Sequence, residues 1–187
     1  MLIVIGLLYP DPESIWPGMR GLALLLFLFA ALTDWLDGWL ARKFGQVSEF
    51  GKFMDALADK VLTMGIFVSL LALGALEKWT LFLILLILSR EFLITGLRLV
   101  AAAKGKTLAA EKLGKVKTVV QLICISLFLA ELALEADGTK ILSLDSNLNA
   151  VEFLRWAGQS SLIFATFLTV FSGIVYLVKY WKYFLDD

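Results

Sequence analysis

Four aspartates lie within two hydrophobic stretches of this chain, at residues 34–38 (DWLDG) and 51–59 (GKFMDALAD). A carboxylate inside a membrane-spanning helix carries a large free-energy cost, so acids retained there generally mark a functional site. The two stretches therefore predict membrane helices that carry carboxylate chemistry.

The composition of the whole chain also indicates an integral membrane protein. Apolar residues make up 60% of the 187 residues and charged residues 18%, and the mean hydropathy is +0.85. The apolar residues form repeated runs close to the ~20 residues that cross a bilayer as a helix. Because backbone groups in lipid must find partners within the protein, we expect an all-α fold.

The hydrophobic runs predict five spanning helices, at residues 18–40, 50–76, 79–103, 116–134 and 159–183. The apolar residues 1–8 are too short to span alone, and we expect them to be the end of a truncated first helix. They have no basic region and no small-residue cleavage site, which argues against a signal peptide. We expect the polar residues 136–157 to lie outside the membrane, with an interfacial helix that carries Phe153 and Trp156.

Basic residues gather near alternate ends of these spans, whereas the opposite ends are mostly acidic. By the positive-inside rule, we expect a multi-pass membrane protein whose basic ends face the cytoplasm. The basic residues are Arg42, Lys43, Lys52, Lys104, Lys106, Lys112, Lys115, Lys117, Lys179 and Lys182.

The chain contains no histidine and a single cysteine, Cys124, in the middle of an apolar run. This composition excludes histidine-based catalysis, multi-thiolate metal sites and intrachain disulfides. We interpret Cys124 as a packing residue, because a buried thiol behaves as a small hydrophobe. Any chemistry must therefore use carboxylates, lysines and arginines.

Helical spacing places the first pair of acids on one face. Asp34, Asp37, Gly38 and Ala41 follow the i, i+3, i+4, i+7 pattern of a single helical stripe. The next helix repeats the arrangement, because Gly51, Asp55 and Asp59 recur every four residues.

The connector at residues 42–49 is short, so we expect the two helices to be antiparallel neighbours. All four carboxylates should then meet near the cytoplasmic surface. Four acids would repel one another without cations, and an all-oxygen ligand set suits Mg²⁺ or Mn²⁺. We expect two ions and phosphoryl chemistry, with Gly38 allowing close approach of a ligand and Arg42 neutralising a phosphate.

Two other interpretations of the acids remain open. They could form a structural ion network with Arg42, Lys52 and Lys60, although four acids in two matched stripes exceed what packing needs. They could instead line the path of a divalent-cation transporter. Transporters tend to bind near the midplane and to show repeated halves, whereas these acids cluster toward one face of a chain with no evident internal repeat.

The spacing Asp34-x-x-Asp37-Gly38-x-x-Ala41-Arg42, eight residues, Gly51-x-x-x-Asp55-x-x-x-Asp59 resembles the signature of the CDP-alcohol phosphotransferase family. This resemblance implies six transmembrane helices, usually a homodimer, with residues 1–187 as a single transmembrane catalytic domain. It also implies transfer of a phosphatidyl-type group from a CDP-linked donor to an alcohol, with release of CMP.

The resemblance further implies a role for each matching position. Asp34, Asp37 and Asp55 would be metal ligands, and Asp59 would complete the second ion site and act as general base. The donor's nucleotide or diphosphate would contact Gly38, Arg42 and Ser48.

A second group of cations, Arg90, Arg98, Lys115 and Lys117, could form a pocket for an acceptor that itself carries a phosphate. Alternatively, Arg90 and the adjacent Glu91 could simply pair with each other or with neighbouring helices.

After the aspartate motif, the chain has an Arg-Glu pair (Arg90-Glu91), a later arginine (Arg98) and a Gly-Lys-x-Lys-Thr run (residues 114–118). This order is similar to that of the bacterial phosphatidylglycerophosphate synthases within the family. This similarity implies CDP-diacylglycerol as donor and glycerol-3-phosphate as acceptor. The phosphatidylinositol-phosphate synthases are the alternative, because inositol phosphate is also anionic. We expect the lipid bilayer but no nucleic acid among the partners.

Overall fold

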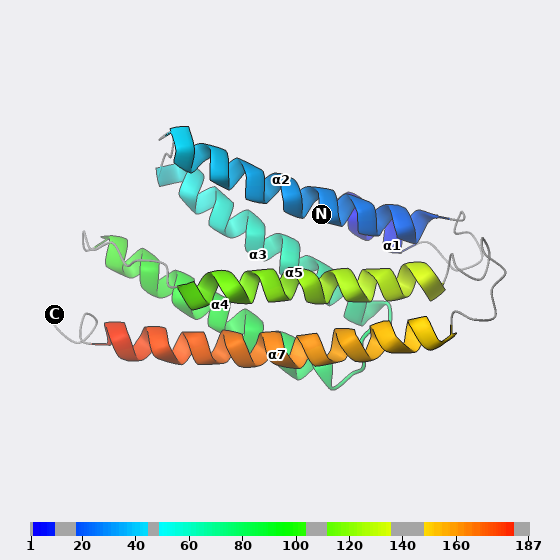
Figure 1. The fold of residues 1–187 in the computed structure, drawn as a ribbon. Helices are drawn as coiled ribbons and strands as arrows, with labels where there is room; N and C mark the ends of the chain where they lie inside the picture. Colours follow the sequence, from blue (N-terminus) through cyan, green and yellow to red (C-terminus); the bar gives the residue numbers. More distant parts are fainter. Residues whose placement is uncertain (1, 10–17, 45–48, 104–111, 136–147, 182–187) are drawn as a thin grey trace.

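The computed structural model describes residues 2–9, 18–44, 49–103, 112–135 and 148–181 (Figure 1). Regular secondary structure within these ranges is entirely helical, which confirms the all-α fold. The helices are α1 (Leu2–Leu8), α2 (Met19–Phe44), α3 (Glu49–Ala72), α4 (Thr80–Ala103), α5 (Lys112–Ala133) and α7 (Leu148–Tyr180).

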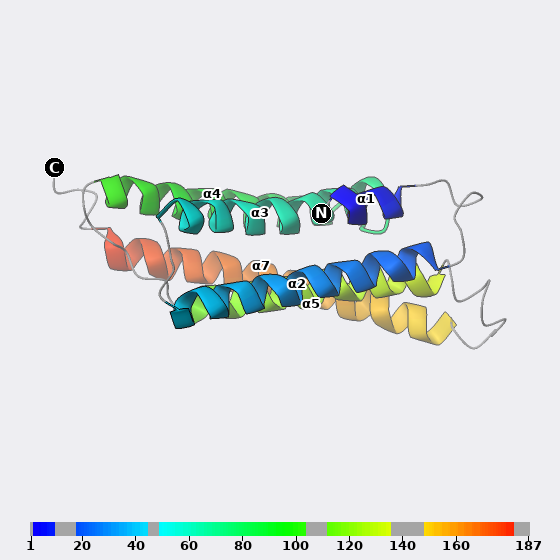
Figure 2. The same cartoon turned by 90° about the horizontal axis from the view of Figure 1, so that it is seen from above.

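The long helices run side by side along one axis in two layers. Seen from above, α1, α3 and α4 form one layer, and α2, α5 and α7 form the other (Figure 2). Helix α5 packs most extensively against α7 and also against α2 and α3, while α4 packs against α7. Helix α5 therefore occupies the centre of the bundle and links the two layers.

Three of the expected spans are long and apolar enough to cross a membrane, judged by length and composition within the described residues. They are Thr80–Ala102, Val116–Ala133 and Asn149–Tyr180. The two expected spans that carry the acidic motif form α2 and α3, and α3 contributes a shorter apolar stretch, Lys60–Ala72. The chain is thus built as a multi-pass membrane protein.

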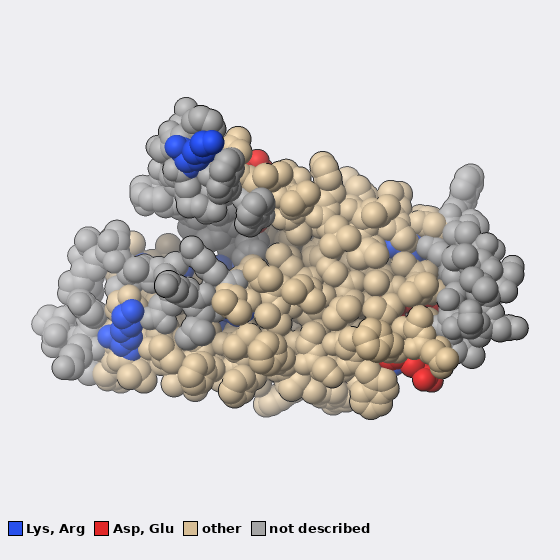
Figure 3. All heavy atoms as spheres, in the orientation of Figure 1, with Lys and Arg blue, Asp and Glu red and all other residues tan. Residues whose placement is uncertain are grey.

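Successive long helices alternate in direction (Figure 1). As a result, the C-terminal ends of α2, α4 and α7 lie at the same end of the bundle as the N-terminal ends of α3 and α5. Most of the visible lysine and arginine surface lies at this end in the space-filling view, and most of the visible acidic surface lies toward the other end (Figure 3). The fold therefore gathers at one end the chain segments in which the sequence concentrates its basic residues.

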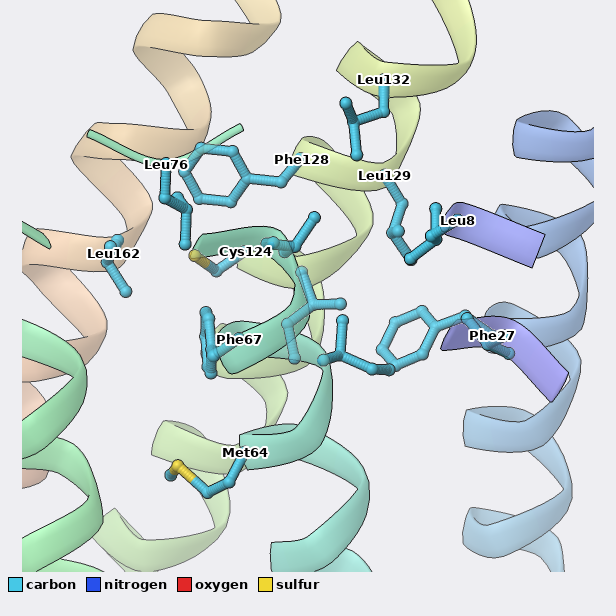
Figure 4. Close-up of a cluster of buried hydrophobic side chains, with 14 of the residues drawn as sticks. Leu8, Phe27, Met64, Phe67, Leu76, Cys124, Phe128, Leu129, Leu132 and Leu162 are labelled. Atoms are coloured by element: carbon cyan, nitrogen blue, oxygen red, sulfur yellow. The ribbon is translucent and has the colours of Figure 1, made fainter. Parts of the chain in front are cut away.

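The buried core draws on every helix (Figure 4). Phe27 of α2, Phe67 of α3 and Phe128 of α5 are almost completely buried, and Leu162 of α7 closes one side. Leu8 of α1 is also buried, so even this short helix contributes to the core. Cys124 lies within the same cluster, which confirms the expected packing role.

Helix α3 ends four residues before the expected boundary because Gly74 terminates it. Gly74 has φ = 72°, its N–H donates to Leu71 O, and the Ala75 N–H donates to Leu70 O. This hydrogen-bond pair is the Schellman motif, which needs a residue in the left-handed region and strongly favours glycine. Hydrophobicity continues to Leu76, but the helical conformation does not.

Helix α7 begins at Leu148, eleven residues before the expected span, and continues without interruption to Tyr180. The expected interfacial helix is therefore helical but not separate: Phe153 and Trp156 belong to the first turns of α7 and are 70% and 69% exposed. A helix of 33 residues is about 50 Å long, whereas the hydrocarbon core is about 30 Å thick. The first turns of α7 thus have length to extend beyond the bilayer.

Helices α5 and α7 approach closely at Gly158. A methyl group added at Gly158 would lie 2.9 Å from Cε1 of Phe128, and this ring is buried in the core. Such overpacking of a well-filled core typically costs about 1–3 kcal/mol.

We predict that Gly158→Ala lowers the thermal midpoint of the purified protein in detergent. Gly96→Ala is the matched control, because Gly96 lies in α4 and an added methyl group there meets nothing within 4 Å. The control should be neutral or slightly stabilising, since alanine is the better helix former. Equal midpoints for the two variants would contradict the tight α5–α7 crossing.

Candidate functional site

The acidic motif lies at the end of the bundle where α2 ends and α3 begins. Asp34 and Asp37 are in the second half of α2, and both are exposed in the isolated chain. Asp55 and Asp59 are in the first half of α3, which runs antiparallel to α2. The side chains of Asp55 and Asp59 lie outside those that the structure describes, so the meeting of all four carboxylates stays a prediction.

Two of the expected donor-binding residues lie at the same end. Gly38 and Arg42 are in the last two turns of α2, and their backbone is helical. The Arg42 side chain and the whole of Ser48 lie outside the described residues. The structure therefore places Gly38 and Arg42 beyond the acids of α2 without showing their contacts, and the role of Ser48 stays a prediction.

Three of the four expected acceptor residues belong to a polar seam between α4, α5 and α7. Glu91 of α4 accepts a hydrogen bond from Lys117 Nζ of α5 and lies 3.5 Å from Arg90 Nη1. The side chains of Arg90 and Glu91 are each 12% exposed, and that of Lys117 is 7% exposed. The interpretation that Arg90 and Glu91 pair with each other and with a neighbouring helix is therefore correct as a description of their contacts.

Arg98 lies two turns beyond Arg90, toward the end of the bundle that carries the acidic motif. Its Nε donates to Tyr176 Oη of α7 at 3.4 Å, and its guanidinium carbon lies 5.3 Å from the centre of the Tyr176 ring. The contact combines a hydrogen bond with a cation–π interaction. The fourth expected residue, Lys115, is in α5, but its side chain is not among those described.

The seam brings three cations together around one acid. Among its described side chains, Arg90, Arg98 and Lys117 are the cations and Glu91 is the acid. Arg90 and Lys117 also make interactions beyond those with Glu91 and Ser172. The seam therefore links α4, α5 and α7 through ionic and hydrogen-bonded contacts.

Sequence reasoning missed the residues of α7 that accept hydrogen bonds from polar side chains of α4 and α5. Arg90 Nη2 donates to Ser172 Oγ at 3.0 Å, and Gln121 Nε2 of α5 donates to Thr169 Oγ1 at 3.4 Å. Thr169, Ser172 and Tyr176 follow one another at intervals of three and four residues, which places them on one face of α7. That spacing of polar residues in an apolar helix was the signal available in the sequence.

A separate ion pair lies at the opposite end of the bundle. Arg155 Nε of α7 donates to Glu131 Oε1 of α5 at 2.7 Å, and Arg155 Nη2 lies 3.9 Å from Glu135 Oε1. Nearby, Arg20 Nη1 of α2 donates to the Leu132 carbonyl at 3.5 Å. These contacts fasten helix ends far from the acidic motif, so we assign them a structural role.

A sequence model of the CDP-alcohol phosphatidyltransferases matches residues 1–171 of the chain. The CDP-diacylglycerol--glycerol-3-phosphate 3-phosphatidyltransferase of Bacillus subtilis is 39% identical over 158 residues, which cover 84% of this chain and 72% of that protein. The protein of the same name from Rickettsia felis is 36% identical over 165 residues, which cover 88% and 82%. The probable phosphatidylglycerophosphate synthase of Mycobacterium tuberculosis is 41% identical over 114 residues, which cover 61% and 53%.

We predict that Glu91→Gln destabilises the bundle, because it leaves Lys117 and Arg90 without the carboxylate that they share. Removing one partner of a buried ion pair typically costs about 3 kcal/mol or more. The measurement is the free energy of unfolding in mixed detergent micelles.

Glu135→Gln is the matched control, since it removes an exposed carboxylate 3.9 Å from Arg155 and should change the stability by less than about 1 kcal/mol. Adding Lys117→Met to Glu91→Gln should recover part of the loss. Equal stability of the Glu91→Gln and Glu135→Gln variants would mean that the α4–α5 ion pair contributes nothing.

Proposed function

Because the chain belongs to the CDP-alcohol phosphatidyltransferase family, we propose that it transfers the phosphatidyl group of CDP-diacylglycerol to sn-glycerol-3-phosphate. The products are phosphatidylglycerophosphate and CMP. The observation that carries the choice of acceptor is the gathering of three cations, Arg90, Arg98 and Lys117, in the seam between α4, α5 and α7. The names of the similar proteins support the same donor and acceptor.

The seam suits an acceptor that bears a phosphate monoester. Such a group carries about −1.5 to −2 charges near pH 7, which suits a site where several cations lie close together. Guanidinium groups also donate several hydrogen bonds in a fixed plane, the geometry that phosphate oxygens accept best. We assign Arg90, Arg98, Lys115 and Lys117 to the acceptor phosphate.

The donor set of the acidic motif fits a hard divalent cation. Asp34 and Asp37 offer carboxylate oxygens on one face of α2, and α3 brings Asp55 and Asp59 to the same end of the bundle. We propose that these four aspartates hold Mg²⁺ or Mn²⁺, most simply two ions. When bound, the ions would neutralise the donor's diphosphate and stabilise the charge that develops on it.

The residues of the chain then have distinct tasks. Gly38, Arg42 and Ser48 bind the nucleotide and diphosphate of the donor. Asp59 accepts the proton of the acceptor hydroxyl as general base. The hydroxyl oxygen forms a bond to the β-phosphorus of the donor, and the bond from that phosphorus to CMP breaks.

The basic end of the bundle, which also carries the acidic motif, belongs at the cytoplasmic face of the inner membrane under the positive-inside rule. Glycerol-3-phosphate and CDP are water-soluble groups that would reach the site from that side. We also propose a homodimer, as the resemblance to the family implies. Inositol phosphate is the alternative acceptor, because it presents the same anionic group to the seam.

The first test is CMP release from CDP-diacylglycerol by the purified protein with Mg²⁺ or Mn²⁺. We expect selective stimulation by glycerol-3-phosphate over inositol phosphate, serine and no acceptor, and loss of activity when EDTA removes the metal. Stimulation by another alcohol would keep the family and replace the acceptor. Folded protein without metal-dependent release would favour a structural network or a cation transporter instead.

A second prediction concerns the acceptor residues. Arg90→Ala and Lys117→Ala should each raise the KM for glycerol-3-phosphate more than the KM for CDP-diacylglycerol, because each variant removes a cation from the seam. Steady-state kinetics with each substrate varied in turn provides the measurement. Equal changes in the two KM values would exclude these residues from an acceptor pocket.

A further inference from the structure

At Thr169 and Ser172, helix α7 presents hydrogen-bond acceptors, rather than donors, to the neighbouring helices. Ser172 Oγ donates its proton to the Thr169 carbonyl at 3.0 Å, and Thr169 Oγ1 donates its proton to the Ala165 carbonyl at 2.6 Å. Each hydroxyl has one proton, and each donates that proton to a backbone carbonyl of α7. The free lone pairs of Ser172 and Thr169 can therefore only accept, and they accept from Arg90 and Gln121, respectively.

The bond between Arg90 and Ser172 fixes one end of the guanidinium. Ser172 is 2% exposed, so water does not compete for its lone pair. The hydroxyl cannot rotate toward another acceptor without giving up its bond to the Thr169 carbonyl. A buried acceptor whose direction is set by its own helix therefore holds Arg90 Nη2 in one place.

Gly173 constrains the stem of the same arginine. A methyl group added at Gly173 would lie 2.8 Å from Arg90 Cγ and 3.1 Å from Arg90 Nε. Side-chain carbons do not approach so closely, and Cγ is too near the backbone to move away without reorienting the whole side chain. The absence of a side chain at Gly173 thus leaves the space in which Arg90 lies.

We propose that Ser172 and Gly173 are positioning residues that aim the Arg90 guanidinium at the acceptor phosphate. Ser172 binds Nη2, and Gly173 leaves room for the stem and Nε. Nη1 lies 3.5 Å from Glu91 Oε1, the carboxylate oxygen that also accepts from Lys117. The proposal rests on the proposed function, in which Arg90 binds the phosphate. It adds that α7, which carries none of the family's aspartates, sets the affinity for the acceptor.

The test compares the KM for glycerol-3-phosphate with the KM for CDP-diacylglycerol in the full-length protein. Ser172→Ala and Ser172→Cys both remove a good acceptor, and cysteine also keeps the size of the side chain. Each should raise the acceptor KM about tenfold, as expected when a hydrogen bond from a charged group is lost. The donor KM should stay near that of the parent protein.

Two further variants separate positioning from packing. Ser172→Thr keeps the hydroxyl and should keep the acceptor KM close to the parent value. Gly173→Ala should raise the acceptor KM at least as much as Ser172→Ala, because it displaces the arginine itself. Thr166→Val is the matched control: Thr166 is a buried residue of α7 whose hydroxyl donates to its own helix at Leu162 O, and this change should alter neither KM.

The thermal midpoint of every variant is recorded in parallel, so that a loss of fold is recognised. If Ser172→Ala does not fold, the proposal is tested by comparing the acceptor KM of Ser172→Cys with that of Ser172→Thr. An unchanged acceptor KM in the Ser172 variants overturns the proposal, as does an equal rise in both KM values. If Arg90→Ala is selective for the acceptor while the Ser172 variants are not, the positioning role fails alone. If Arg90→Ala is itself unselective, the acceptor pocket fails and the positioning role fails with it.

Discussion

The cost of an unpaired charge inside the bilayer constrains how α4, α5 and α7 pack. Glu91 lies in the middle of α4, and its side chain is only 12% exposed, so its charge needs partners within the protein. It is stabilised by Lys117 of α5 and Arg90 of its own helix, and Arg90 in turn is held by Ser172 of α7. Sliding any one of these helices along its axis would break at least one of these bonds, so the ionic seam fixes their register.

Close packing supports the same arrangement at two levels of α7. Gly158 receives the Phe128 ring, and Gly173 receives the stem of Arg90. The first contact lies in the apolar core toward the end where α7 begins, and the second lies in the polar seam toward the end that carries the acidic motif. Apolar packing therefore holds α5 and α7 together at a level of the bundle away from the polar seam.

Hydrophobic length predicted most helix boundaries well, because a spanning segment must match the thickness of the bilayer. It failed where local geometry overrides hydrophobicity. Helix α3 stops at Ala72 because Gly74 adopts a left-handed conformation, although apolar residues continue. Helix α7 starts at Leu148 because a helix can continue into water beyond the apolar run. Hydrophobicity therefore did not predict that the polar residues before the run belong to the same helix.

The sequence by itself determined the membrane-embedded helical fold, the shared faces of the aspartates and the family, because composition and short-range periodicity carry these properties. It also supplied the cations of the seam, but not their partners. Only the tertiary structure decided that Lys117 reaches Glu91, 26 residues earlier, and that Arg90 reaches Ser172, 82 residues later. Such pairs depend on which helices become neighbours and in which register they pack, and helical periodicity within one segment contains no information about either.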